Sequence, residues 1–273
     1  MKQSKEFSKR MTKLIIFLNL FLLLIYSDIL AQNKIQERWE FSIGGGISFP
    51  VGVYSKKNPA ESVIINYLTL NPSSSLKQYV GFAKDKSGFA KLGPDYNLEI
   101  KYSLNTDLSV KVIAGCFTNP VEAPVISDYL TKLGGETKME ESPYRIIYLA
   151  PGFEYQRQLN KISLGLSFNA GYSLTNFPYY KFVYLFTTTV PYIFFGNVGP
   201  RPDLRSLTMG AGLSITYNLG KRMKIGLNAI YQRSNFPYHM SNQLTPGSGA
   251  WYEIDDILKV RVFNTAIKLD YTF

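Results

Sequence analysis

The sequence is poor in the residues from which most catalytic and metal centres are built. Its 273 residues include one cysteine, Cys116, and one histidine, His239. A single cysteine excludes an intrachain disulfide and a cysteine-based metal cage, and a single histidine weakens any zinc proposal. No cofactor-binding motif stands out either. We therefore expect no cofactor and no catalytic, cofactor-binding or metal-binding residues.

Clusters of basic residues are also missing beyond the first residues of the chain. The formal net charge is +10, of which residues 1–31 contribute five basic and two acidic side chains, so +7 remains without them. The remaining Lys and Arg residues are scattered, which gives no support for nucleic-acid binding. Attraction to anionic lipid headgroups is the simpler use of this charge, although solubility would explain it too.

Long apolar runs are rare, and one of them lies near the start of the chain. Five basic residues precede an apolar run from Leu14 to Ile25 that only Asn19 interrupts. A membrane-spanning helix needs about 20 apolar residues, so this shorter run predicts a Sec-type signal peptide over residues 1–31. We expect cleavage between Ala31 and Gln32, which leaves 32–273 as one domain. An uncleaved inner-membrane anchor is the alternative.

What the chain has in abundance is alternation of apolar and polar residues with a period of two. This pattern is typical of strands that have one apolar and one polar face. It recurs eight times and is clearest from Ile162 to Tyr172 and from Leu207 to Leu219. The eight segments begin near Trp39, Tyr96, Leu108, Ile147, Ile162, Leu207, Met223 and Phe263.

The size of the polar side chains indicates which face points inward. Gly, Ser, Thr and Asn dominate the polar faces, whereas a water-exposed surface would carry more Lys and Glu. Small residues suit the narrow interior of an eight-stranded barrel, and the bulky face then suits lipid. A soluble lipocalin-like barrel would have the opposite arrangement.

The connections support a closed, antiparallel, up-and-down transmembrane β-barrel. Tight turns are predicted around Asn105–Thr106, Leu159–Asn160 and residues 218–221, and four long extracellular loops over about 55–88, 118–143, 174–205 and 233–258. Short turns at one end and long loops at the other are typical of transmembrane barrels. We predict eight strands, and ten if the third long loop adds a hairpin to the barrel.

Several of these features together carry a resemblance to a known family. They are the signal segment, Gly44-Gly45-Gly46 in the first strand, the eight alternating segments, and the ending Leu269-Asp270-Tyr271-Thr272-Phe273. With them the chain resembles the small outer-membrane β-barrel proteins, including OmpA/OmpX-type and PorT-like barrels. The resemblance implies a bacterial outer-membrane protein, with Tyr271 and Phe273 as the signal read by the barrel-assembly machinery after periplasmic chaperones. The family includes anchors, adhesins, assembly factors and a few enzymes, so it implies no single activity.

Eight charged residues are expected to point into the barrel. Four acidic and four basic side chains in a narrow interior of low dielectric must pair or change their protonation. A salt-bridged plug is the first interpretation, and a lumen that conducts ions or relays protons is the second. The predicted network consists of Glu40, Glu99, Lys101, Lys111, Glu154, Lys224, Lys268 and Asp270.

The third long loop is unusually aromatic and almost uncharged. A loop of this kind is expected to contact a protein, a glycan or the outer leaflet, or to be buried against the rim of the barrel. The candidate contact surface consists of Phe177, Tyr179, Tyr180, Phe182, Tyr184, Phe186, Tyr192, Phe194 and Phe195.

The predicted role is non-enzymatic, either structural or binding through the loops. One alternative is a barrel-embedded hydrolase acting on lipid A or peptides, with His239 as the base near Ser234, Ser241, Asp255 and Asp256. Another is an accessory subunit of an envelope export or assembly complex, which the PorT-like resemblance alone suggests.

Overall fold

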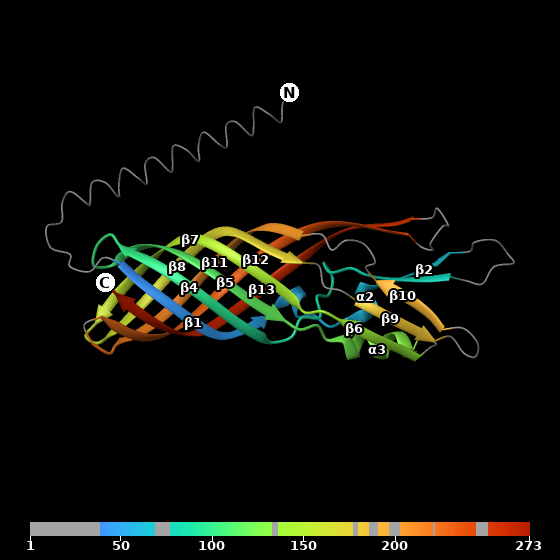
Figure 1. The fold of residues 1–273 in the computed structure, drawn as a ribbon, viewed down its shortest axis with the longest axis horizontal. Helices are drawn as coiled ribbons and strands as arrows, with labels where there is room; N and C mark the ends of the chain where they lie inside the picture. Colours follow the sequence, from blue (N-terminus) through green and yellow to red (C-terminus); the bar gives the residue numbers. More distant parts are fainter. Residues whose placement is uncertain are drawn as a thin grey trace, which may run out of the picture.

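Eight antiparallel strands form a closed barrel in the computed structural model, which confirms the predicted fold (Figure 1). The structure describes residues 39–68, 77–132, 136–176, 180–185, 191–196, 203–220, 222–243 and 251–273. Each barrel strand pairs with its neighbours along the chain, and the first pairs with the last. The barrel strands are β1 (Trp39–Pro50), β4 (Gly93–Ser103), β5 (Leu108–Asn119), β7 (Tyr144–Leu159), β8 (Ile162–Asn176), β11 (Asp203–Asn218), β12 (Met223–Gln243) and β13 (Trp251–Thr272).

The two ends of the barrel differ, as the connection lengths predicted. Short turns join β4 to β5, β7 to β8 and β11 to β12 at one end, which we call the turn rim. The β7–β8 turn places Asn160 at a φ of 58°, a left-handed conformation that asparagine tolerates in two-residue hairpins. Trp39 and Phe273 lie at the same end, joined by a backbone hydrogen bond of 3.0 Å. We call the opposite end the loop rim.

Further elements lie beyond the loop rim (Figure 1). The first connection holds a 3₁₀ turn and a hairpin, and the second and third connections together form a separate three-stranded sheet in the order β10-β9-β6. The third connection therefore adds a hairpin outside the barrel, and the barrel keeps eight strands. These elements are η1 (Gly52–Tyr54), α2 (Pro59–Ser62), β2 (Val63–Leu68), β3 (Lys77–Phe82), α3 (Ala123–Lys132), β6 (Glu136–Glu141), β9 (Tyr180–Leu185) and β10 (Pro191–Gly196).

The segment 233–258, predicted as a loop, is largely strand. β12 and β13 remain paired from Met223–Tyr271 as far as Gln243–Trp251, so they form a long hairpin that leaves the barrel. Alternation continues past the barrel in this segment because Phe236, Tyr238 and Leu258 are buried against the elements of the loop rim.

The register of the strands fixes their tilt. A line of paired residues that starts at Leu159 of β7 passes once around the ring and returns to the same strand at Leu149, ten residues away. An offset of this size tilts the strands by about 40° from the barrel axis. At a rise of about 3.3 Å per residue, each residue then advances about 2.5 Å along the axis.

The bulky face of every barrel strand points outward, as predicted. The exposed apolar side chains extend on β8 from Ile162 to Leu174, which corresponds to a band about 30 Å tall. Aromatic residues lie toward both edges of this band, with Trp39 and Tyr271 near the turn rim and Tyr172 toward the loop rim. None of the described residues belongs to a helix long and apolar enough to cross a membrane.

The interior differs from the prediction in its half nearer the loop rim. There the inward positions include large apolar side chains, such as Ile113, Phe117 and Ile146, beside small polar ones such as Ser173 and Ser234. The half nearer the turn rim follows the prediction. Close packing continues into the middle of the barrel, where a Cβ atom at Gly46 would lie 1.7 Å from the carbonyl oxygen of Thr265 on β13.

Candidate functional site

The structure brings all eight predicted interior charges into one network in the half of the lumen nearer the turn rim. Lys111 lies between two carboxylates, at 2.8 Å from Glu99 Oε2 and 3.1 Å from Glu154 Oε2. Lys101 is 2.5 Å from Glu40 Oε1 and 3.3 Å from Glu154 Oε1.

Two further lysines extend the network across the junction of the first and last strands. Lys268 of β13 is 2.8 Å from Glu99 of β4 and 3.8 Å from Asp270. Lys224 of β12 forms an ion pair with Glu40 of β1. Four carboxylates and four ammonium groups balance to zero net charge, and all except Lys224 are almost fully buried.

This network is suited to closing the lumen. A buried charge is tolerated when it is paired, and removal of one partner leaves the other charge uncompensated. Since each of these lysines lies beside at least one carboxylate, no unpaired cation in the network is available to attract a passing anion. The arrangement supports the salt-bridged plug, and an aqueous path through it would have to separate these pairs.

A polar layer lies above the network. Asn97 donates to Asp95 Oδ2 at 3.2 Å, and Gln232 donates to Thr208 Oγ1 at 2.9 Å. Ser173 donates to Ser234 Oγ at 3.0 Å. The first bond lies within β4, the second joins the neighbouring strands β12 and β11, and the third joins β8 to β12 past β11. The layer therefore ties β8, β11 and β12 together where the charge network ends.

An apolar plug closes the lumen at the loop rim. Tyr54 of η1 and Phe89, from the connection between β3 and β4, are fully buried against inward side chains of the barrel. Tyr144 donates to the carbonyl oxygen of Gly88 at 2.7 Å, and its ring centroid is 5.2 Å from that of Tyr54. The first connection is therefore folded into the mouth of the barrel.

Charged groups around the mouth fasten this plug. The backbone N–H of Lys84 donates to Asp256 Oδ2 at 2.5 Å, and the Tyr238 hydroxyl donates to the same oxygen at 2.6 Å. Burial and the neighbouring Asp256 carboxylate raise the pKa of Tyr238, which keeps its hydroxyl protonated as a donor. At the outer edge, Lys57 donates to Glu122 at 2.9 Å and lowers the pKa of that carboxyl group.

His239 meets only part of the constellation that a hydrolase needs. Its Nδ1 lies 2.8 Å from Asp255 Oδ1 on the exposed face of the β12–β13 hairpin. Ser234 points into the barrel instead, and Asp256 accepts hydrogen bonds from the first connection. The side chain of Ser241 lies outside the described residues. Among the described side chains, the structure brings together one base, His239, and one carboxylate, Asp255.

The remaining predicted site residues fall into three groups. Ala31, Gln32, Phe177, Tyr179 and Phe186 lie outside the described residues. The other loop aromatics lie on β9 and β10, where Phe182 pairs with Phe194 and Tyr184 with Tyr192. Tyr271 and Phe273 stand at the turn rim on the outer face, with ring centroids 6.3 Å apart.

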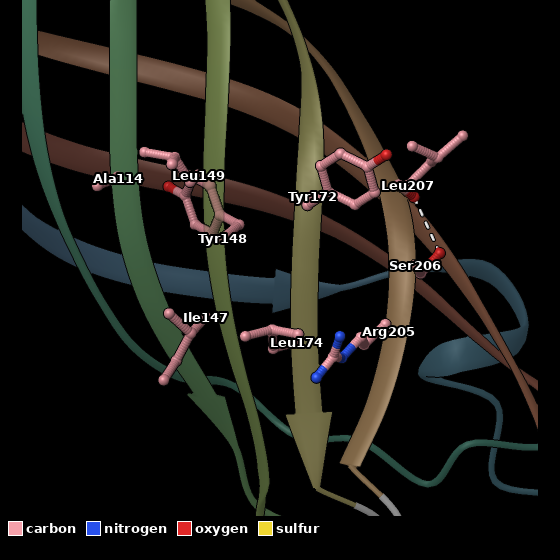
Figure 2. Close-up of a pocket in the computed structure, with 9 residues that line it drawn as sticks. All are labelled: Ala114, Ile147, Tyr148, Leu149, Tyr172, Leu174, Arg205, Ser206 and Leu207. Atoms are coloured by element: carbon pink, nitrogen blue, oxygen red, sulfur yellow. Dashed lines mark hydrogen bonds between the residues drawn. The ribbon is translucent and has the colours of Figure 1, made fainter.

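A groove on the outer face of the barrel was not predicted from the sequence. It has a volume of about 700 Å³ and crosses β5, β7, β8 and β11 toward the loop rim, and Arg205 is the charged residue among the described ones that line it (Figure 2). The residues that line it are far apart in the sequence, so only the strand register could have revealed it. Among the described residues, no group of three or more His, Cys, Asp and Glu side chains could hold a metal ion.

Comparison with known proteins gives structural likenesses at low sequence identity. No protein-family model and no curated protein match the sequence. The outer membrane protein OprG from Pseudomonas aeruginosa is similar with a TM-score of 0.47 and 11% identity, over 86% of this chain and 97% of that one. Ail, the attachment invasion locus protein of Yersinia pestis, has a TM-score of 0.39 and 14% identity, over 88% and 100%.

The outer membrane protease OmpT from Escherichia coli is also similar, with a TM-score of 0.41 and 10% identity, over 88% of this chain and 99% of that one. At these identities and TM-scores, the likenesses carry no functional argument. The fold assignment rests on the closed ring of paired strands.

Proposed function

We propose that this chain is an integral protein of a bacterial outer membrane, with the turn rim in the periplasm and the loop rim outside the cell. The supporting observation is the apolar band about 30 Å tall on the outer face of the ring, while the charged side chains at the same level, such as Glu99 and Lys111, point inward. A closed ring satisfies every strand edge, which hydrocarbon requires. Short periplasmic turns and long external loops are the usual arrangement of such barrels.

The protein acts without transporting solutes through its lumen. The charge network and the apolar plug occupy the two halves of the interior, and an eight-stranded barrel is only wide enough to be filled by side chains. Its function is then carried by the elements beyond the loop rim, namely the sheet of β6, β9 and β10 with its aromatic strands. We propose a non-enzymatic binding role for this sheet, with a protein or glycan as the partner.

The membrane location is tested by cell fractionation combined with a gel on which samples are compared before and after boiling. A folded barrel resists the detergent and changes its migration on boiling. Recovery of the chain as a water-soluble periplasmic monomer without detergent would overturn the proposal. Planar-bilayer recording of the purified barrel should show no steady conductance, and a stable open channel would contradict the sealed lumen.

The binding role is tested by replacing residues 181–191, most of the β9–β10 hairpin, with a short Gly-Ser linker. The barrel should keep its heat-dependent migration, because the hairpin lies outside the ring. Binding of whole cells that display the variant to host-matrix proteins or glycan arrays should be lost relative to cells that display the unaltered chain. Equal binding by both would exclude the hairpin as the contact surface.

Hydrolysis is the second candidate, and the 2.8 Å contact between His239 and Asp255 is the observation in its favour. A carboxylate oriented in this way can hold an imidazole as a general base. His239→Ala should leave lipid A structure and envelope proteolysis unchanged if the role is non-enzymatic. Loss of either activity in this variant would establish the enzyme instead.

A further inference from the structure

The groove on the outer face combines an apolar wall with a cationic end toward the loop rim. Ile147 and Leu149 of β7, Tyr172 and Leu174 of β8, and Leu207 of β11 supply the wall. Ala114 of β5 contributes only a methyl group, which leaves space between bulkier neighbours. Figure 2 shows the Arg205 side chain extending from β11 toward Leu174, on the loop-rim side of the wall. The volume of about 700 Å³ is in the range of sites that hold small molecules.

Arg205 is one of four arginines on the outer face near the loop rim. Arg145 lies on β7 two residues beyond Ile147, Arg233 lies on β12, and Arg261 pairs directly with Arg233 from β13. The strand register and tilt place all four within about three residue steps of the same level along the barrel axis. They form a basic arc above the apolar band.

These arginines have no acidic partner among the described residues. Within the part of the chain that the structure describes, no ion pair involves any of the four guanidinium groups, whereas most of the lysines in the loop-rim elements are paired, as Lys57 is with Glu122. Unpaired guanidinium groups at the edge of an apolar band are placed where lipid phosphates lie. Arg is suited to this role because its planar fork donates two parallel hydrogen bonds to a phosphate.

We propose that the groove binds lipid A, with acyl chains along the wall of Ile147, Leu174 and Leu207 and a phosphate held by Arg205 and Arg145. The inference rests on the proposed membrane location and orientation, which turn the arc toward the outer leaflet. Lipid A is the anionic lipid of that leaflet. Its several acyl chains and separated phosphates fit a wide groove beneath an arc of several cations better than a lipid with one phosphate does.

The three strands that hold the site explain its geometry. Ile147, Leu174 and Arg205 are directly paired in register across β7, β8 and β11. Arg145 and Arg205 therefore flank the loop-rim end of the groove from the two sides of β8. A phosphate on the loop-rim side of Leu174 can accept hydrogen bonds from both arginines. The acyl chains, which extend from it toward the turn rim, cover apolar surface that is otherwise exposed to the bilayer.

The test measures binding of purified lipid A to the folded barrel in detergent micelles by native mass spectrometry. Arg205→Ala combined with Arg145→Ala should weaken binding about tenfold or more, because two charge-assisted contacts are lost. Arg157→Ala is the matched control, since this exposed arginine lies on β7 near the turn rim and outside the arc. Ala114→Phe should weaken binding by filling the groove while every charge is kept.

The outcomes separate this inference from the proposed function. All variants are first checked for heat-dependent migration, which reports a folded barrel. A water-soluble chain would overturn the membrane location itself. A folded, membrane-embedded barrel that binds lipid A equally with and without the two arginines would overturn only the lipid site. Equal binding of phosphatidylglycerol in the same micelles would likewise reject lipid A as the occupant.

Discussion

Leu213 gives the most direct test of which face of the barrel contacts lipid. This residue lies on β11 with a relative exposure of 64%, six positions from Leu219 at the turn rim. At about 2.5 Å per residue along the axis, Leu213 lies about 15 Å inside an apolar band about 30 Å tall. It is therefore near the midplane of the bilayer.

Leu213→Lys should lower the free energy of unfolding by about 2–4 kcal/mol, the cost of a lysine at the bilayer midplane. With a denaturant dependence of about 2 kcal/mol per molar urea, the unfolding midpoint should fall by about 1–2 M. The measurement is reversible urea unfolding in lipid vesicles, followed by tryptophan fluorescence.

Leu219→Lys is the matched control, because Leu219 is also exposed, at 56%, but lies at the edge of the band. Its substitution should cost about 0–1 kcal/mol. If both variants unfold like the unaltered protein, the outer face is in contact with water, and the face assignment fails together with the membrane location.

The other predictions concern the interior and the plug. Lys111→Met should destabilise the barrel by about 3–5 kcal/mol in the same urea assay, since Glu99 loses one of its partners; an unchanged midpoint would mean that the charges are hydrated. Gly46→Ala should lower the midpoint measurably, because the new Cβ would meet the β13 backbone at 1.7 Å, whereas Gly45→Ala, whose Cβ would meet nothing closer than 3.8 Å, should not. The plug should loosen in acid. The hydrogen bond from Lys57 lowers the pKa of Glu122 from its usual 4.5. The contribution of this ion pair to stability is therefore complete above pH 4.5 and is lost as the pH falls through the lowered pKa. Hydrogen exchange of residues 84–91, corrected for intrinsic rates, should then rise at low pH, and the same rise in Glu122→Gln would contradict this cause.

The sequence predicts the ring of strands well because the period-two signal is strong wherever one face is apolar and the other polar. The segment Ile162–Tyr172 is such a case, and its outward residues are the predicted ones. The same signal identified the inward charges, because Lys111 and Glu154 alternate with apolar neighbours on their strands.

The signal fails where both faces of a strand are apolar. Ile146 and Ile147 are adjacent, and one points into the plug while the other points outward. Periodicity alone cannot show which residue of such an apolar run points inward. Ile146 is buried because the first connection folds into the mouth of the barrel, and no local sequence pattern predicts that folding. The arginine arc could not be predicted from the sequence for a related reason. Arg145 and Arg205 are 60 positions apart, and only the strand tilt that follows from the ten-residue offset places them at the same height along the barrel axis.

The ion pairs that cross the junction of β1 and β13 have a consequence for assembly. Lys224 and Lys268 belong to the last two strands, while Glu40 and Glu99 belong to the first two. Until β13 pairs with β1, these four groups lie at opposite edges of an open sheet. The ion pairs across the junction are then not formed, and water must solvate these charges instead. Insertion of a half-built sheet into hydrocarbon is therefore penalised, and closure of the ring between β1 and β13 removes that penalty in a single cooperative step.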